Sequence, residues 1–589
     1  MRRSVFAGGR AVTANLAGGP REIEGGTRAA LEYRLEQIAC APTRTGYLVK
    51  TTKPDPSRPN VLIILADDLG YSDLGAYGGE IATPNLDALA AGGLWFTQFN
   101  STPRCSPSRA SLLTGLHPHQ CGIGILTGRF GEGDYEGNLN RRCVTMAEVL
   151  DAAGYRCYGT GKWHLTDHDD FDAPNGSWPT ERGFHHHYGS LGGVDSYYWP
   201  KFLYRDRQRL NVGADEDFYY TDAISDATVG YLRRHAAEHP GRPFFQYVAY
   251  TAPHWPLHAR EEDIAKYAGR FDRGWDRLRA ERLARMIRLG VVAPGGQLSA
   301  RDPAVPAWAD LSAAERAWQA RRMEVYAAQV DRMDQGIGRI VAALRETGQL
   351  DRTLLVFLSD NGGCAEEPPP NAGADRWQQA STRAGATVRF GNDPAIRPGP
   401  EDTFQYYGVP WANVSNTPFR MYKHWTYRGG LASPCIVHWP AGIADRGARR
   451  LHHAYLPDGM ATVLDATGAA YPAGIPRCEG TSLIPAFRNE PLPARSMFWE
   501  HEGNAAVRDG DWKLVLNFCA SPTGRRPEGD ERGDWELYDT AADPADLRNI
   551  ARAHPERVRP MKAAWHEWAA RVGVIPREEW LRRRAATRA

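Results

Sequence analysis

The chain has 589 residues, of which 42% are hydrophobic, 10% aromatic and 24% charged. This length and balance exclude a small single module and wholesale disorder, and they predict a large domain accompanied by at least one smaller one. The 71 Lys and Arg residues nearly balance the 70 Asp and Glu residues. The chain therefore has no global basic field that would attract nucleic acid or an anionic membrane.

The longest apolar runs, VLIILA from Val61 and LLVFL from Leu354, are much shorter than the roughly 20 residues that a bilayer-spanning helix requires. Arg10 interrupts the N-terminal segment before an apolar run of signal-peptide length can form. We therefore expect a cytoplasmic protein without a membrane partner. The nine cysteines are spread without a repeating framework, which favours buried thiols over a disulfide scaffold.

The pattern of the sequence divides the chain into three parts. Residues 1–57 lack sustained periodicity and are predicted to form an N-terminal extension. Residues 58–490 alternate apolar runs with helical patterns and are predicted to form the main domain, with a helical insertion at 260–322 and a surface loop or lid at 365–412. Residues 491–589 predict a smaller C-terminal domain that has an antiparallel sheet plus a helix.

Three apolar runs of the main domain lead into polar residues, and a long helical pattern from Trp318 to Leu350 lies between two of them. The polar residues that follow the runs are Asp67 and Asp68, Asp360 and Asn361, and His254. This alternation predicts an α/β fold, a large doubly wound, mixed but mostly parallel sheet flanked by helices. Ligands of such sheets bind beyond the carboxyl ends of the strands, so we expect one site there.

The string CSPSRASLLTG, residues 105–115, is the most specific motif of the chain. Pro107 suits the first turn of a helix, so Cys105 is predicted at a helix N-terminus, where free N–H groups and the helix dipole favour anions. Arg109 adds a cation one turn later. An isolated CxPxR pattern is equally compatible with a structural cysteine, but the whole string is far harder to produce by chance.

Further strings accompany this motif: NVLIILADDLG, GYRCYGTGKWH, APHWPLHA, SDNGG and YKHWTYRGG. Together they resemble the sulfatase family, and within it the bacterial arylsulfatase branch of the alkaline phosphatase-like superfamily. The resemblance covers about Pro59 to Trp512, which makes residues 58–490 the catalytic sulfatase domain. The family usually has Ser or Thr at the position of Cys157, so this residue departs from the family pattern. The position is not a catalytic one.

The resemblance implies hydrolysis of sulfate monoesters, aryl sulfates or similar ones, to an alcohol or phenol and inorganic sulfate. It also implies that a formylglycine-generating enzyme, a partner during maturation, oxidises Cys105 to formylglycine. The hydrated aldehyde then attacks sulfur, and its second hydroxyl lets the sulfated intermediate collapse by C–O cleavage.

Catalytic roles carry over from the resemblance to matching positions. Asp360 takes the proton of the nucleophile, His254 protonates the leaving oxygen, and His164 holds and deprotonates the second hydroxyl. Lys162 and Lys423 hold the nonbridging sulfate oxygens, and Arg109 orients the formylglycine. The predicted catalytic set is Cys105, Arg109, Lys162, His164, His254, Asp360 and Lys423.

A divalent cation would offset the negative charge of a sulfate ester. The oxygen donors at the strand ends form a hard set that suits Ca²⁺ or Mg²⁺ better than zinc, and the resemblance implies Ca²⁺. An Asp pair after a strand is by itself more often a helix cap or an ion-pair partner, so the metal interpretation depends on the combined motifs. The predicted metal ligands are Asp67, Asp68, Cys105, Asp360 and Asn361.

Two alternatives stay open at this point: a phosphonate monoester or phosphodiester hydrolase of the same superfamily, and a noncatalytic protein that binds sulfated ligands through an unmodified Cys105. The oligomeric state stays open as well. The three histidines at 185–187 resemble metal ligands, but adjacent side chains rarely converge on one ion, so we expect no metal there. Five aromatic residues are expected to belong to the core rather than to an aryl pocket: Tyr197, Tyr198, Trp199, Trp255 and Trp411.

Overall fold

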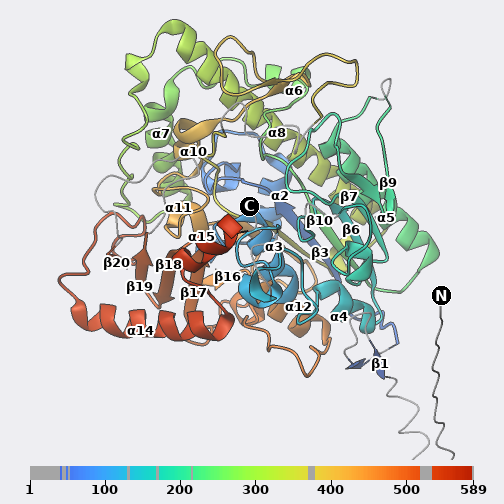
Figure 1. Ribbon diagram of the computed structural model, residues 1–589. Coiled ribbons are helices and arrows are strands. Elements are labelled where there is room, and N and C mark those ends of the chain that lie inside the picture. Colours follow the sequence, from blue (N-terminus) through green and yellow to red (C-terminus); the bar gives the residue numbers. More distant parts are fainter. Residues whose placement is uncertain are drawn as a thin grey trace, which may run out of the picture. The chain divides into compact units, whose positions relative to one another are not determined.

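The computed structural model describes residues 40–42, 48–50, 53–128, 133–167, 171–213, 217–368, 379–517 and 534–586 (Figure 1). Most of the predicted N-terminal extension and part of the predicted loop at 365–412 therefore lie outside the described residues.

A large mixed sheet forms the centre of the main domain. Among the described residues it has ten strands in the spatial order β15 (Ala448–Arg450), β4 (Leu94–Phe96), β14 (Cys435–His438), β11 (Thr353–Ser359), β3 (Asn60–Ala66), β10 (Phe244–Ala249), β6 (Arg156–Gly161), β7 (His186–Ser190), β8 (Leu203–Arg205) and β9 (Gln208–Arg209). The five strands from β11 to β7 run parallel, whereas β14 and β8 pair antiparallel with β11 and β7. The predicted α/β fold class is confirmed.

Strand β3 is apolar from Val61 to Ala66 because helices cover both faces of the sheet. Its side chains alternate between two buried clusters, since successive residues of a strand point to opposite faces. Val61, Ile63 and Leu65 pack in the cluster of α3 (Cys105–Thr114), α4 (Met146–Ala152) and α12 (Asp458–Thr467). Leu62 and Ile64 pack in the cluster of α2 (Pro84–Gly92), α5 (Tyr220–Glu238) and α8 (Ala313–Glu346). Each such side chain stabilises the fold by roughly 1.5–3 kcal/mol.

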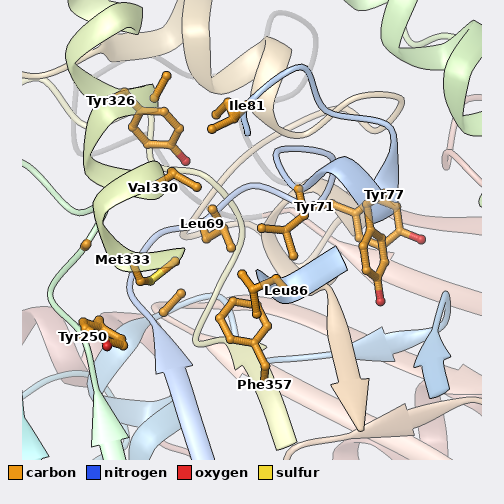
Figure 2. Close-up of a cluster of buried hydrophobic side chains, with 14 of the residues drawn as sticks. Leu69, Tyr71, Tyr77, Ile81, Leu86, Tyr250, Tyr326, Val330, Met333 and Phe357 are labelled. Carbon is orange, nitrogen blue, oxygen red and sulfur yellow. The ribbon is translucent and has the colours of Figure 1, made fainter. Parts of the chain in front are cut away.

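Helix α8 covers the centre of one face of this sheet. Figure 2 shows Tyr326, Val330 and Met333 of this helix facing Leu69 and other buried side chains near the sheet. Their spacing of four and three residues places them on one side of the helix. The helix begins at Ala313, earlier than the sequence pattern indicates, because Ser312 and Glu315 form a capping box.

The C-terminal part forms a separate antiparallel sheet, as predicted. It contains β17 (Ser496–His501), β18 (Asn504–Asp509), β19 (Trp512–Leu516) and β20 (Trp535–Asp539), paired in that order. Helix α14 (Pro555–Val572) lies along this sheet (Figure 1) and buries Trp565 and Trp568 against it. Helix α15 (Arg577–Ala586) follows.

Apart from α7, the remaining elements of the described residues are short. Paired strands outside the two sheets are β1 (Cys40–Pro42) with β2 (Leu48–Lys50), β5 (Phe99–Asn100) with β16 (Ala454–Tyr455), and β12 (Arg389–Phe390) with β13 (Thr403–Phe404). The remaining α-helices are α6 (Glu261–Ala265), α7 (Gly274–Leu289), α10 (Gly408–Ser415), α11 (Arg428–Leu431) and α13 (Ile484–Phe487). We find among the described residues no helix that combines the length and apolar character needed to cross a membrane.

The segment 365–412 differs from the predicted surface loop where it is described. It contributes β12, β13 and the start of α10, and its Phe404 and Trp411 are fully buried. The Gly and Pro residues of this segment indicate a loop, but they lie between aromatic residues that are packed. Phe404 packs against Trp255, and Trp411 packs against Trp275. Tertiary packing therefore overrides the local loop signal.

Candidate active site

The carboxyl ends of neighbouring parallel strands meet at one edge of the large sheet. The order β11, β3, β10, β6 places the residues that follow these strands side by side. Asp360 and Asn361 follow β11, Asp67 and Asp68 follow β3, and Lys162 follows β6, and all five are buried. His254 lies on the loop after β10 rather than at the strand end, and it is also buried.

Cys105 is the first residue of helix α3, which begins beside this edge. Pro107 occupies the first turn, where a missing N–H costs no helical hydrogen bond. Cys105 is buried, and the Ser108 hydroxyl of the next turn donates to the backbone oxygen of Asp360. The helix N-terminus is therefore fixed against the carboxyl end of β11.

Arg109 connects α3 to the same edge. Its Nη2 and Nε donate to Oδ2 of Asp360 at 2.8 and 3.2 Å, and its Nη1 donates to the Lys162 carbonyl at 2.9 Å. Nη2 is also 3.5 Å from Asp67 Oδ2. Burial and the charge of Asp67 raise the pKa of Asp360, although Arg109 opposes that rise.

Two lysines neutralise the Asp pair that follows β3. Lys162 donates to Asp67 Oδ2 at 2.5 Å, and Lys423 donates to Asp68 at 3.0 Å. Burial by itself would raise the pKa of Asp68, but the charges of Lys423 and His254 outweigh it and lower the value to about 2. The Asp68 side chain is therefore an ionised carboxylate at neutral pH.

His254 has a defined tautomer in this network. Its Nδ1 donates to the Trp255 carbonyl at 2.6 Å, because a carbonyl can only accept. The opposite nitrogen, Nε2, lies 3.3 Å from Asp68 Oδ2 and 3.4 Å from Lys423 Nζ. Burial, followed by the charges of Lys423 and Lys162, lowers the pKa of His254 to about 3 despite Asp68.

His164 lies on the chain that continues from β6 past Lys162. Its φ of 52° is left-handed, and its ring packs against the backbone of Gly193, where a Cβ would lie 2.4 Å from the ring. Burial and the nearby Lys162 and Arg109 charges hold the pKa of His164 well below its usual range. Its imidazole is therefore neutral in this structure.

The oxygen atoms at the strand ends fit a hard divalent cation. Asp67 Oδ1 and Asn361 Oδ1 are buried and have no hydrogen-bond partner among the described residues. Ligand atoms of Asp67, Asp68 and His254 lie within 4.8 Å of one another. Buried oxygens that lack a donor are costly, and a cation would satisfy them.

Sequence reasoning missed Glu366, which lies beside these residues. Its carboxylate pairs with Arg104, with His424 at 3.1 Å and with Lys423 at 3.4 Å. The residue falls in the segment interpreted as a loop, and its only local signal is its position shortly after the SDNGG string. Cys364 donates to Glu366 Oε2 at 3.2 Å and is a buried thiol, as predicted.

The structure also describes the histidines and tryptophans that the sequence singles out. Among the described residues, no member of the His triplet at 185–187 belongs to a group with metal-binding spacing. Trp411 is a core residue that packs edge-on against Trp275. Trp255 differs, because its ring lies beside His254 with the centroids 4.5 Å apart and so belongs to the site.

Comparison with known proteins agrees with this architecture. The family model described as Sulfatase matches residues 59–469. An uncharacterized sulfatase of Schizosaccharomyces pombe is 30% identical over 562 residues, which are 88% of this chain and 95% of that protein. An arylsulfatase of Klebsiella aerogenes is 33% identical over 410 residues, which are 66% of this chain and 82% of that protein.

A solved structure shares the fold of this chain. The crystal structure of Ps i-CgsB aligns with a TM-score of 0.59 at 25% identity, covering 87% of this chain and 93% of that one. The family match extends over more than half of the chain and includes the strands that carry the buried Asp and Lys residues. This chain therefore belongs to the sulfatase family, whose members hydrolyse sulfate esters.

Proposed function

We propose that this chain hydrolyses aryl or similar sulfate monoesters with a formylglycine nucleophile, which a formylglycine-generating enzyme forms from Cys105. The observation that carries the proposal is the position of Cys105 at the N-terminus of α3, beside Arg109 and the buried strand-end network. Cys105 is close enough to Arg104, Arg109 and Lys423 to interact with their charges. An anionic ester bound beside Cys105 would be attracted by these buried cations.

Lys162 and Lys423 act as the clamp for the nonbridging sulfate oxygens. Each ammonium group has three N–H donors and uses some of them for the Asp pair, so donors remain for the substrate. A Ca²⁺ ion would be held by Asp67, Asp68, Asp360, Asn361 and the side chain at 105. Such an ion supplies charge neutralisation at the sulfate group.

Asp360 takes the proton of the attacking hydroxyl. Arg109 fixes its carboxylate by two hydrogen bonds to one oxygen, and burial beside Asp67 raises its pKa, which strengthens it as a base. His164 is neutral in the structure and can therefore accept the proton of the second hydroxyl. Gly193 keeps its ring in position.

His254 protonates the leaving oxygen through Nε2, since its Nδ1 hydrogen is committed to the Trp255 carbonyl. Burial, together with the charges of the nearby lysines, keeps this histidine neutral. A bound sulfate ester brings a negative charge that opposes those lysines, and Lys423 lies 3.4 Å from Nε2. His254 must therefore gain a proton at Nε2 before it can act as the acid, and the charge of the bound ester favours that protonation.

An apolar wall beside His254 supports an aryl leaving group. Trp255 packs with Phe404 and Tyr406 at centroid distances of 5.6 and 5.1 Å. The similar Klebsiella aerogenes protein is named an arylsulfatase. The seven cysteines whose side chains the structure describes are free thiols, which fits a reducing compartment, and we propose a cytoplasmic location on that basis.

Two measurements test the proposal. Mass spectrometry of the peptide that contains Cys105 should detect the aldehyde in protein coexpressed with a formylglycine-generating enzyme. The kcat/KM for an aryl sulfate should then exceed that for an aryl phosphonate monoester, and Cys105→Ala should lower kcat by at least about 10⁴-fold.

A higher kcat/KM for the phosphonate would support the alternative hydrolase of the same superfamily. Sulfate binding without turnover by aldehyde-containing protein would support a noncatalytic binder. A Cys105→Ala variant as active as the wild type would refute the formylglycine mechanism.

A further inference from the structure

A second group of metal-binding side chains lies outside the residues assigned to the sulfatase reaction. It consists of His424, His501 and Glu502, whose ligand atoms all lie within 4.8 Å of one another. His424 follows Lys423 in the chain, whereas His501 ends β17 and Glu502 lies in the turn to β18. We propose that these three residues bind a divalent transition-metal ion of the Zn²⁺ type, separate from the carboxylate site.

The buried nitrogen atoms of this group carry the proposal. His501 is only 1% exposed, and within the described part of the chain neither of its ring nitrogens has a hydrogen-bond partner. His424 is 3% exposed, and its Nδ1 likewise makes no hydrogen bond to a described residue. Each buried polar atom left unsatisfied costs about 1–3 kcal/mol, so two adjacent imidazoles of this kind indicate a missing ligand.

The surroundings of His424 orient one nitrogen toward the group. Its Nε2 is 3.1 Å from Glu366 Oε1, and its Nδ1 is 3.6 Å from Glu502 Oε2. Nε2 also lies 2.5 Å from Arg104 Nη1, which can only donate, so Nε2 accepts a hydrogen bond there and the ring proton lies on Nδ1, which faces Glu502. Metal binding at Nδ1 therefore requires this proton to move to Nε2, where Glu366 can accept it. Metal-bound histidines commonly donate their other nitrogen to a carboxylate in this way.

The donor types select the class of metal. Two imidazoles and one carboxylate suit Zn²⁺ or a similar transition metal, whereas the oxygen-only group of Asp67, Asp68, Asp360 and Asn361 suits Ca²⁺. Tetrahedral zinc with bonds of about 2.1 Å separates its ligand atoms by roughly 3.4 Å. The observed 3.6 Å between His424 Nδ1 and Glu502 Oε2 is close to that value.

Contacts from three parts of the chain hold the group together. The His424 backbone N–H donates to the Pro103 carbonyl at 2.8 Å, and the Asn504 amide donates to the His424 carbonyl at 3.2 Å. His424 and Glu502 both have left-handed backbones, with φ of 88° and 51°. Conformations of this kind cost energy in residues other than glycine, and they recur where a side chain is held for a ligand. The Glu502 side chain is 18% exposed, so an ion can reach the group from solvent.

Cobalt titration tests the site independently of sulfatase activity. The full chain is stripped with a chelator and titrated with Co²⁺, whose visible absorption reports nitrogen and oxygen ligands in a site of low coordination number. We expect one equivalent to bind and to be displaced by Zn²⁺. His501→Ala should weaken binding by at least about 100-fold, because it removes a ligand, while the exposed His566→Ala should bind like the wild type.

Two further variants separate this site from the carboxylate site. Asp67→Asn should keep the cobalt spectrum, and His501→Ala should keep the wild-type Ca²⁺ content in elemental analysis. His501→Gln serves in place of His501→Ala if circular dichroism shows that the alanine variant is unfolded. The proposal is overturned if the folded wild type binds no Co²⁺ or Zn²⁺, if the histidine variant binds them equally well, or if only Asp67→Asn loses the signal.

Discussion

Arg109 and Asp360 form a fully buried ion pair in which two guanidinium nitrogens donate to one carboxylate oxygen, at 2.8 and 3.2 Å. The pair joins helix α3, which carries Cys105, to the carboxyl end of β11. This ion pair therefore links the helix of Cys105, the proposed nucleophile, to Asp360, the proposed base.

Arg109→Ala should destabilise the fold by about 3–5 kcal/mol, because it leaves the Asp360 carboxylate buried without its ion-pair partner and removes one of the two cations beside Asp67. The free energy of unfolding in urea measures the effect. Arg277→Ala is the matched control, since its ion pair with Glu281 is exposed and should change that free energy by less than about 1 kcal/mol. Equal losses in the two variants would contradict the structural role of the buried pair.

Gly193→Ala should lower kcat by about 100-fold, because the new Cβ displaces the His164 ring and a shift of this size misaligns a catalytic group. Steady-state kinetics with an aryl sulfate measures the effect. Gly230→Ala in helix α5 is the control: no atom lies near its added Cβ, so kcat should stay unchanged and the helix should gain roughly 0.5–1 kcal/mol. A Gly193→Ala enzyme with wild-type kcat would show that the position of His164 does not matter.

Calcium should raise the thermal unfolding midpoint of chelator-treated protein. A ligand that binds only the folded state at about 100 times its Kd adds about 2.7 kcal/mol of stability. Asp67→Asn should abolish most of this shift, because it removes a buried carboxylate ligand, whereas the exposed Asp272→Asn should retain it. Differential scanning calorimetry distinguishes the two, and equal shifts in both variants would exclude the strand-end carboxylates as the calcium site.

His117 should make stability depend on pH below neutrality. Burial lowers its pKa to about 3 despite Glu479, while the unfolded chain has a histidine pKa of about 6.5. Between these values the unfolded state binds the proton and the folded state does not, so stability falls as the pH is lowered. The slope from this residue is up to about 1.4 kcal/mol per pH unit.

His117→Gln should reduce that slope, as measured by urea unfolding at several pH values from about 7 down to about 4.5. His566→Gln is the control and should keep the wild-type slope, since the His566 side chain is exposed to solvent rather than buried. Identical slopes in all three proteins would mean that His117 takes up its proton equally well when folded.

The sequence alone predicts the strand-end part of the site because the local patterns are strong. The apolar run of β3 ends at Asp67 and that of β11 at Asp360, and parallel strands bring such ends to one edge. The sequence predicts His254 at a strand end, but this residue lies on the loop beyond β10. The error arises because the apolar pattern continues past the last residue that pairs with β3.

Glu366 and the group of His424, His501 and Glu502 could not be predicted in the same way. These residues come from the segment after β11, from the loop that carries Lys423 and from a hairpin of the C-terminal sheet. No periodicity or spacing links such positions, since only the packing of the small sheet against the main domain brings His501 near His424.

Local patterns suffice to predict the α/β fold class, the separate C-terminal sheet and the charged residues at the strand ends, because alternation and apolar run length are local properties. Tertiary packing sets which charges neutralise one another, where the described part of segment 365–412 is buried, and which histidines of the described residues lack hydrogen-bond partners. Those outcomes depend on contacts between residues far apart in the chain. The low polarity of the protein interior makes each buried polar contact contribute more to the free energy of folding.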